Sequence, residues 1–254
     1  MPATVAALYE TASDAMLARG GAASDALRRL LKRIFFEAHT LQRRVIDDWQ
    51  LDEAALGLEA PEELARIREW AVAKAGGFKR SSGLDEVTFP LRAMPASVAE
   101  LRNACAALLS EATRDALAEV RRRVACDELP LLSLLQASPL RVQSSHLSFQ
   151  EYFAAKALCE EGATLALGVK PWHMPAWWAN ALEMGAEMGE GFGRGLLRAA
   201  GVTGDELDLD AQLGGHQPTA LRAVGLLPLK TVYLNSACPP TAPPRARRRL
   251  CMRA

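Results

Sequence analysis

The stretch Ser145-His-Leu-Ser-Phe-Gln-Glu-Tyr-Phe-Ala-Ala-Lys-Ala157 combines several independent local signals that agree on one structure. Ser148 and Glu151 have the spacing of a capping box, in which the Ser hydroxyl and the Glu carboxylate each accept a backbone N–H of the first helical turn. The residues Leu140-Arg-Val142, just upstream, favour a short strand. We therefore expect a strand, a turn and then a helix that starts at Phe149.

The helix expected from Phe149 has a clear apolar face. Leu147 and Tyr152 stand where a hydrophobic staple places its two side chains. Phe149, Phe153 and Ala157 recur at helical spacing and form a stripe that we expect to be buried. We expect the rest of the chain to be organised around this helix.

His146 precedes the predicted cap and lies beside the positive end of the helix dipole. The dipole and the exposed backbone N–H groups both favour negative charge there, so an imidazole at this place can help to hold an anion such as phosphate. The other interpretation is a histidine that satisfies a neighbouring carbonyl. Local physics alone leaves both interpretations open.

The segment from His146 to Ala155, His-Leu-Ser-Phe-Gln-Glu-Tyr-Phe-Ala-Ala, closely resembles the His-x-Ser/Thr-Phe-Gln-Glu-Phe/Tyr-x-Ala-Ala signature of NACHT-family NTPases. That family includes the NLR immune sensors, and its motif lies at the end of the winged-helix domain that follows the nucleotide-binding core. The resemblance implies that His146 contacts the β-phosphate of bound ADP and holds the molecule closed. Packing and capping roles are implied for the other signature residues: Phe149, Glu151, Tyr152 and Phe153.

Two further segments extend this resemblance. An amphipathic helix is expected over residues 4–19, and its Leu8-Tyr-Glu10 resembles the start of the helix that closes the family's helical domain before the winged helix. The run from Leu129 to Val142 predicts a short buried helix, a turn at Pro139 and a strand. The family carries a similar Leu-Leu element and strand before its motif, so the resemblance covers about residues 129–160.

More helices are expected in the first half of the chain. Ser24 or Asp25 can cap a helix that runs through Arg44, with a wide apolar stripe for the core. Its basic face is interpreted as solvent-exposed, although a nucleic-acid patch is the alternative. His39 on the same helix is expected to be structural. The other expected helices are Val45–Leu58, Pro61–Ala75 and Val98–Ala125, the last with Ser97 and Glu100 as a capping box.

Composition and element order together predict the fold class. Half of the 254 residues are apolar, and the abundance of Ala and Leu favours helix over sheet. We predict a mainly α fold, in which a winged-helix-like domain is followed by a helical bundle, with a short strand or two and a disordered C-terminal tail. The expected parts are the end of a preceding helical domain (1–21), the winged-helix-like domain with a helical insertion at 59–128 (22–160), a second helical domain (161–227), a leucine-rich-repeat start (228–238) and the tail (239–254).

Three stretches of unusual composition lie after residue 160. Pro171–Leu182 holds three Trp, which we interpret as core anchors of a helix starting after Pro175; an aromatic surface for a base or a partner is the alternative. Gly185–Gly195 lacks the spacing of a dinucleotide-binding loop and is interpreted as close helix packing or a helical break. Leu229–Leu234 resembles the strand of a leucine-rich repeat, a module that several stacked units must complete.

Charge and cysteine content exclude several classes of function. The formal net charge is zero, which argues against nucleic acid or an anionic membrane as the main partner. No secretory signal and no apolar window long enough to span a bilayer are evident, so we expect a cytoplasmic protein. The cysteines lack metal-ligand spacing and are interpreted as reduced thiols, with no metal site: Cys105, Cys126, Cys159, Cys238 and Cys251.

No nucleophile–base pair or carboxylate dyad can be assembled from spacing, and Gly77–Gly83 lacks the order of a P-loop. We therefore expect this chain not to be an enzyme and to hold no cofactor by itself. The resemblance implies ADP or ATP only for a full-length parent with a nucleotide-binding domain in cis. Our leading hypothesis is the regulatory portion of a NACHT-like signalling switch, truncated at both ends. The alternatives are a free-standing helical adaptor that binds protein partners, and a nucleic-acid-binding protein that uses the winged-helix-like part and the Arg-rich tail.

Overall fold

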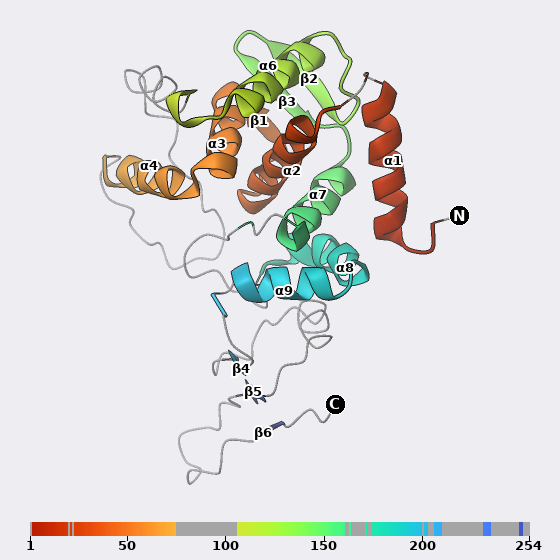
Figure 1. Cartoon of the computed structure of the whole chain (residues 1–254), viewed down its shortest axis with the longest axis vertical. Coiled ribbons are helices and arrows are strands. Elements are labelled where there is room, and N and C mark those ends of the chain that lie inside the picture. The colour runs from red at the N-terminus through yellow and green to blue at the C-terminus, as the bar shows by residue number, and fades with distance from the viewer. Residues whose placement is uncertain are drawn as a thin grey trace. The chain divides into compact units, whose positions relative to one another are not determined.

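The computed structural model describes residues 2–19, 21, 23–74, 106–160, 163, 171, 174–199, 201–202, 206–209, 231–234 and 249–250. This part of the chain is mainly helical and has two small sheets (Figure 1), so the predicted mainly α class is confirmed. The chain divides into two compact units. Unit A comprises Met1–Ala15, Ala38–Arg43 and His146–Ala254, and unit B comprises Met16–Glu37 and Arg44–Ser145. The expected domain 22–160 is therefore divided between the two units.

Helix α2 (Asp25–Thr40) supplies the core of unit B through residues up to Glu37. Ser24 caps it, because the Leu27 N–H donates to Ser24 Oγ over 3.1 Å. The helix ends at Thr40 and not at the predicted Arg44, since Gln42 adopts the left-handed conformation (φ 51°) and breaks the helical repeat. The predicted apolar stripe is buried: Leu27, Leu30, Leu31, Ile34 and Phe35.

Two further helices of unit B have starts that local chemistry explains. Helix α4 (Pro61–Lys74) starts at the proline, as predicted. Helix α6 (Glu111–Ala125) starts where Ser110 Oγ accepts the Thr113 N–H over 3.3 Å. The described part of the predicted helix Val98–Ala125 is thus interrupted by a new cap, while Ser97 and Glu100 lie outside the described residues. Helix α3 (Asp48–Glu59) precedes α4.

An antiparallel sheet completes unit B, and two predictions were wrong there. Strand β1 (Val45–Asp47) replaces the start of the helix predicted for Val45–Leu58, because the Asp47 N–H donates to Gln50 Oε1 over 2.7 Å and delays the helix to Asp48. Strand β2 (Leu132–Ala137) replaces the short helix predicted before Pro139, and strand β3 (Leu140–Ser144) follows as predicted. The order is β1-β3-β2, with Ile46 opposite Val142 and Val142 opposite Leu134.

A buried charge network links α2, α3 and α4 inside unit B. Glu37, which is 6% exposed, accepts from Arg33 Nη2 over 2.6 Å and from Arg68 Nη2 over 2.8 Å. Arg68 also approaches Glu53 over 3.6 Å. Burial opposes ionisation of Glu37, but Arg33 and Arg68 outweigh it and lower the pKa of that carboxyl. The network therefore stays charged.

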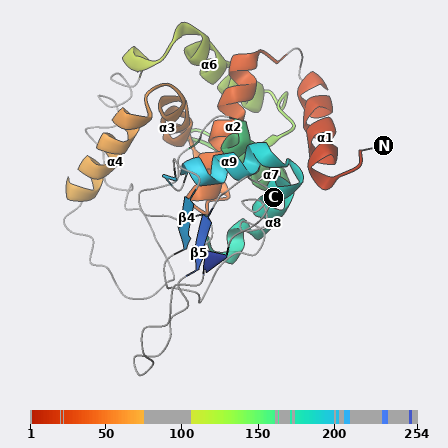
Figure 2. The ribbon, with the colours of Figure 1, turned by 60° about the horizontal axis from the view of Figure 1, so that its bottom comes forward.

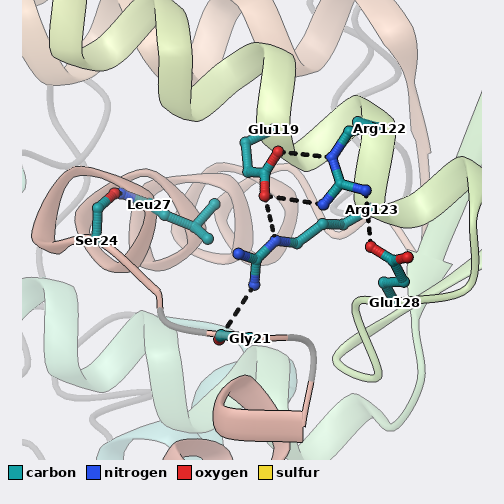
Figure 3. A network of polar contacts seen from close by, with 7 residues as sticks. All are labelled: Gly21, Ser24, Leu27, Glu119, Arg122, Arg123 and Glu128. Atoms are coloured by element: carbon teal, nitrogen blue, oxygen red, sulfur yellow. Dashed lines mark hydrogen bonds and ion pairs between the residues drawn. The ribbon is translucent and has the colours of Figure 1, made fainter.

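A second polar network surrounds the C-terminal end of α6 (Figure 3). Glu119 accepts from Arg122 Nε over 2.8 Å and from Arg123 Nε over 2.6 Å, and Arg122 Nη1 donates to Glu128 over 2.7 Å. Hydrogen bonds from Arg122 and then Arg123 lower the pKa of Glu119 to about 2. Arg123 Nη1 also donates to the Gly21 carbonyl over 3.5 Å, so α6 holds the connection that leads into α2.

Helix α7 (Leu147–Glu160) is the centre of unit A and packs against α8 (Ala179–Glu187) and α9 (Glu190–Ala199) (Figure 1). The short helix η2 (Ala176–Trp178) leads into α8. The approach of α9 to α7 is close, because a Cβ added at Gly195 would lie 2.0 Å from the Leu158 carbonyl oxygen. Both interpretations of the glycine-dense stretch Gly185–Gly195 apply: Gly195 allows close helix packing, and Gly189 (φ 78°) lies in the break between α8 and α9.

A second small sheet contains β4 (Glu206–Leu209), β5 (Thr231–Leu234) and β6 (Arg249–Leu250). Strands β4 and β5 run parallel, with Glu206 opposite Thr231, and Figure 2 shows them side by side. The strand expected at Leu229–Leu234 is present as β5. Strand β4 was not predicted. β6 lies within the tail that was expected to be disordered.

Gly195→Ala should destabilise unit A by about 1–3 kcal/mol, because the added methyl group clashes with backbone and no rotamer can relieve the clash. Urea unfolding followed by circular dichroism measures the change. Arg194→Ala, on the exposed side of the same helix, is the control and should change stability by less than about 0.5 kcal/mol. Equal stability of the Gly195→Ala variant and the wild type would contradict the packing described above.

Glu37→Gln should destabilise unit B by about 3–5 kcal/mol, because it leaves Arg33 and Arg68 with less compensating charge in a buried site. The matched control is Glu190→Gln, which breaks an exposed pair with Arg194 and should cost at most about 1 kcal/mol. Chemical unfolding of both variants gives the comparison, and similar losses for the two would show that the buried network has no special role.

Candidate functional site

His146 is the residue immediately before α7, and its side chain is exposed. The His146 carbonyl accepts the Phe149 N–H over 3.1 Å, which closes the first helical turn. The helix therefore starts at Leu147, two residues earlier than predicted, and Ser148 lies inside it. The predicted start at Phe149, with Ser148 as the residue before the helix, is therefore wrong, although His146 keeps its expected place at the N-terminal end.

Glu151 has a different partner from the one predicted. Its side chain is 5% exposed and accepts from Asn180 Nδ2 over 3.2 Å. Because Asn180 belongs to α8, this hydrogen bond joins two helices of unit A and does not cap a helix. Gln150, which is fully buried, similarly donates to the Arg43 carbonyl over 3.0 Å. Both signature residues thus make tertiary contacts that lie 29 and 107 positions away in sequence.

The aromatic residues of the signature have the packing roles that the resemblance implies. Phe149, Tyr152 and Phe153 are all less than 9% exposed. Tyr9 of helix α1 (Val5–Arg19) meets the Phe149 ring edge-to-face at 5.4 Å and stacks on Tyr152 at 6.0 Å. Burial raises the pKa of Tyr152 to about 12, so its phenol is neutral.

Lys156 of α7 has several polar partners within unit A. Its ammonium group pairs with Glu10 of α1, donates to the Tyr152 hydroxyl over 3.2 Å and approaches Glu160 over 3.5 Å. Burial opposes its charge, but these partners, Glu10 foremost, raise the pKa of Lys156. No local pattern signals this cluster, because Glu10 and Lys156 lie 146 positions apart.

His39 and two tryptophans form a buried aromatic cluster. The His39 ring is 0% exposed, stacks on Trp177 at 5.3 Å and meets Trp178 edge-to-face at 4.4 Å. Trp177 Nε1 donates to the His39 carbonyl over 3.0 Å. Neither ring nitrogen of His39 has a hydrogen-bond partner within the described residues, and burial lowers its pKa to about 3. His39 is structural, as predicted.

The same cluster shows whether the described tryptophans lie in the core or form an aromatic surface. Trp178 is 4% exposed and Trp177 is half-buried, so both anchor the start of α8 in the core of unit A. The interpretation as core anchors is therefore confirmed for these two residues. Trp172 lies outside the described residues.

The chemistry available to the site follows from these contacts. An exposed imidazole at the N-terminal end of a 14-residue helix can donate to an anion, because that end of a helix favours negative charge. In the parts of the chain that the structure describes, no three His, Cys, Asp or Glu side chains gather closely enough to hold a metal ion. None of the helices described has the combined length and apolar character that crossing a bilayer requires.

The chain matches no family model, no curated protein and no solved structure.

His39→Phe should remove a pH dependence of stability. The pKa of His39 is about 3 in the folded chain and about 6.5 when unfolded, so between these values only the unfolded chain takes up the proton. Stability due to this residue is complete above pH 6.5 and falls as the pH decreases toward 3, by up to about 1.4 kcal/mol per pH unit. Urea midpoints at pH 7.5 and pH 5 test this. A wild type and a His39→Phe variant that lose the same stability over that interval would refute it.

Proposed function

We propose that this chain is the regulatory winged-helix and helical part of a NACHT-like nucleotide-dependent signalling switch, and that His146 contacts the phosphate of ADP held by a nucleotide-binding domain in cis. The observation that carries the proposal is the placement of the signature. Its aromatic residues are buried, while His146 alone stands exposed at the helix end. Such a division of roles fits a motif that packs on one side and reads a ligand on the other.

The small C-terminal sheet gives independent support. Glu206 of β4 and Thr231 of β5 are opposite one another in a parallel pair, and they lie 25 positions apart (231 minus 206). Leucine-rich repeats place successive parallel strands about 20–29 residues apart. We propose that β4 and β5 are the strands of two successive units, where the sequence had suggested one.

The proposed mechanism depends on a difference in affinity between two states. A ligand shifts a two-state equilibrium only to the extent that it binds one state better than the other. His146 would supply this difference by donating to ADP in the closed state alone. A hydrogen bond to a charged group contributes about 1.5–3 kcal/mol, which corresponds to a shift in population of about 10- to 150-fold. Because α7 is packed on several sides, it holds the histidine in place at little entropic cost.

A free-standing adaptor is the second candidate, and β2 favours it. Strand β2 lies at the edge of its sheet, with Leu134 37% and Leu135 48% exposed, and an exposed sheet edge can pair with a strand of another protein. An adaptor would bind its partner without any nucleotide-binding domain. Co-purification of a stoichiometric partner with the isolated chain, unaffected by His146→Ala, would favour this candidate over the switch.

His146→Ala should increase the dissociation rate of ADP about tenfold or more when this chain is joined to its nucleotide-binding domain, because one charge-assisted hydrogen bond is lost. Stopped-flow release of a fluorescent ADP analogue measures the rate. Ser148→Ala, in the first turn of the same helix, is the control and should leave it within about twofold.

The isolated chain should show no heat of binding when it is titrated with ADP or ATP, because the proposal places most of the site in another domain. An unchanged ADP release rate in the His146→Ala variant, or tight nucleotide binding by the isolated chain, would each contradict the proposed function.

A further inference from the structure

The first half of α1 binds a defined surface of α7 and α8 within unit A. Glu187, at the end of α8, accepts the Ala6 N–H over 2.8 Å and so caps the N-terminal turn of α1 with a negative charge. One turn further on, Tyr9 packs on two aromatic rings of α7. The next residue, Glu10, pairs with Lys156. We define the helix-binding surface as Phe149, Tyr152, Lys156 and Glu187.

This surface holds α1 through one hydrogen bond, one ion pair and ring contacts of Tyr9, and not through a large apolar contact. Of the residues from Val5 to Ala15, only Ala6 and Ser13 are less than 9% exposed. Val5 and Leu8 are 50% and 54% exposed. A 15-residue helix has marginal stability by itself, so the position of its first half depends on these few contacts. Segments held in this way open locally at a low free-energy cost.

One described residue of the connection that follows α1 is a glycine with a left-handed backbone. Gly21 has φ +95°, in the left-handed region that glycine adopts without strain. In unit B, Arg123 donates to the Gly21 carbonyl over 3.5 Å, close to the upper limit for a hydrogen bond (Figure 3). After α1, therefore, Gly21 has a conformation that glycine adopts without strain and receives one long hydrogen bond from α6.

We propose that the helix-binding surface is an interface between copies of this chain, on which α1 of a second copy takes the place of the chain's own α1. Exchange of an identical element is inexpensive because every contact is rebuilt against the partner, including those of Leu17, which is 2% exposed. The charges specify this occupant: an acidic residue directly after an aromatic one meets Lys156, and a helix N-terminus meets Glu187. At low protein concentration the chain's own α1 occupies the surface, because its effective concentration there exceeds the concentration of other chains.

Charge reversal at the Glu10–Lys156 pair tests the proposal in the full chain. In Glu10→Lys and in Lys156→Glu, like charges face each other and loosen the chain's own α1. In a mixture of the two variants, exchange places the introduced lysine of one chain opposite the introduced glutamate of the other, and the native Glu10 opposite the native Lys156. We therefore expect the dimer fraction, measured by light scattering at equal total concentration, to be about tenfold higher in the mixture than in either variant alone.

Two controls accompany this measurement. The double variant Glu10→Lys/Lys156→Glu restores opposite charges within one chain and should be monomeric with the wild-type melting temperature. Mixing Glu190→Lys with Arg194→Glu, which reverses an exposed pair confined to α9, should produce no dimer.

A peptide of residues 2–19 provides a measurement that needs no change at Lys156. Fluorescence anisotropy should show that the wild-type peptide binds the Glu10→Lys chain at least about tenfold more tightly than the wild-type chain. Mixed variants that stay monomeric would overturn the proposal, as would single variants that dimerise unmixed. Peptide binding without dimers would overturn exchange between copies and assign the surface to a helix from another protein.

Discussion

The burial of α7 is the constraint on which unit A depends. Nine of its 14 residues are buried, and the run Phe149–Ala155 has no exposed position. A helix that is buried all round needs neighbours on every side. Gly195 meets this need by allowing the backbone of α9 to approach the Leu158 carbonyl, since any side chain there would hold the two helices apart. The glycine density of α9 is a consequence of what α7 requires.

Burial also determines which polar groups α7 can carry. Gln150 and Glu151 are tolerated in the core because the Arg43 carbonyl and the Asn180 amide meet them. Two polar residues, His146 and Lys156, lie where the packing around the helix ends. His146 stands at the exposed start of the helix, and Lys156 faces α1 along one side. The proposed nucleotide contact therefore lies at the start of α7, and the proposed exchange of α1 involves one side of the same helix.

The elements that periodicity specifies strongly were the ones that could be predicted. The stripe from Leu27 to Phe35 and the aromatic stripe of α7 identify helices because a 3.6-residue repeat has no other simple explanation. The leucine-rich run that contains β2 has no such repeat, and a short apolar run fits either a helix or a strand. Pairing with β3 decides it, and that is a tertiary contact. Strand β4 was missed although Glu206–Leu209 alternates polar and apolar residues, because Asp and Glu are rare in strands and the pairing with β5 is a tertiary contact.

The site was predictable to a similar degree. The place of His146 followed from its position before the helix, and so did the burial of the aromatic residues. The role of Glu151 could not be predicted. Its Ser-x-x-Glu spacing suggests a cap, and nothing near it in sequence indicates that Asn180 donates to its carboxylate. The surroundings of His39 and Lys156 arise from residues 138 and 146 positions away, which no local pattern encodes.

Native-state hydrogen exchange tests the central claim, that α7 is the fixed element of unit A. Amides from Gln150 to Leu158 should exchange only through global unfolding, with a free energy equal to that from urea denaturation, while amides of α1 exchange through a smaller opening. Exchange of the α7 amides at a free energy as low as that of α1 would show that the helix is not fixed. The account of how His146 is presented would then fail.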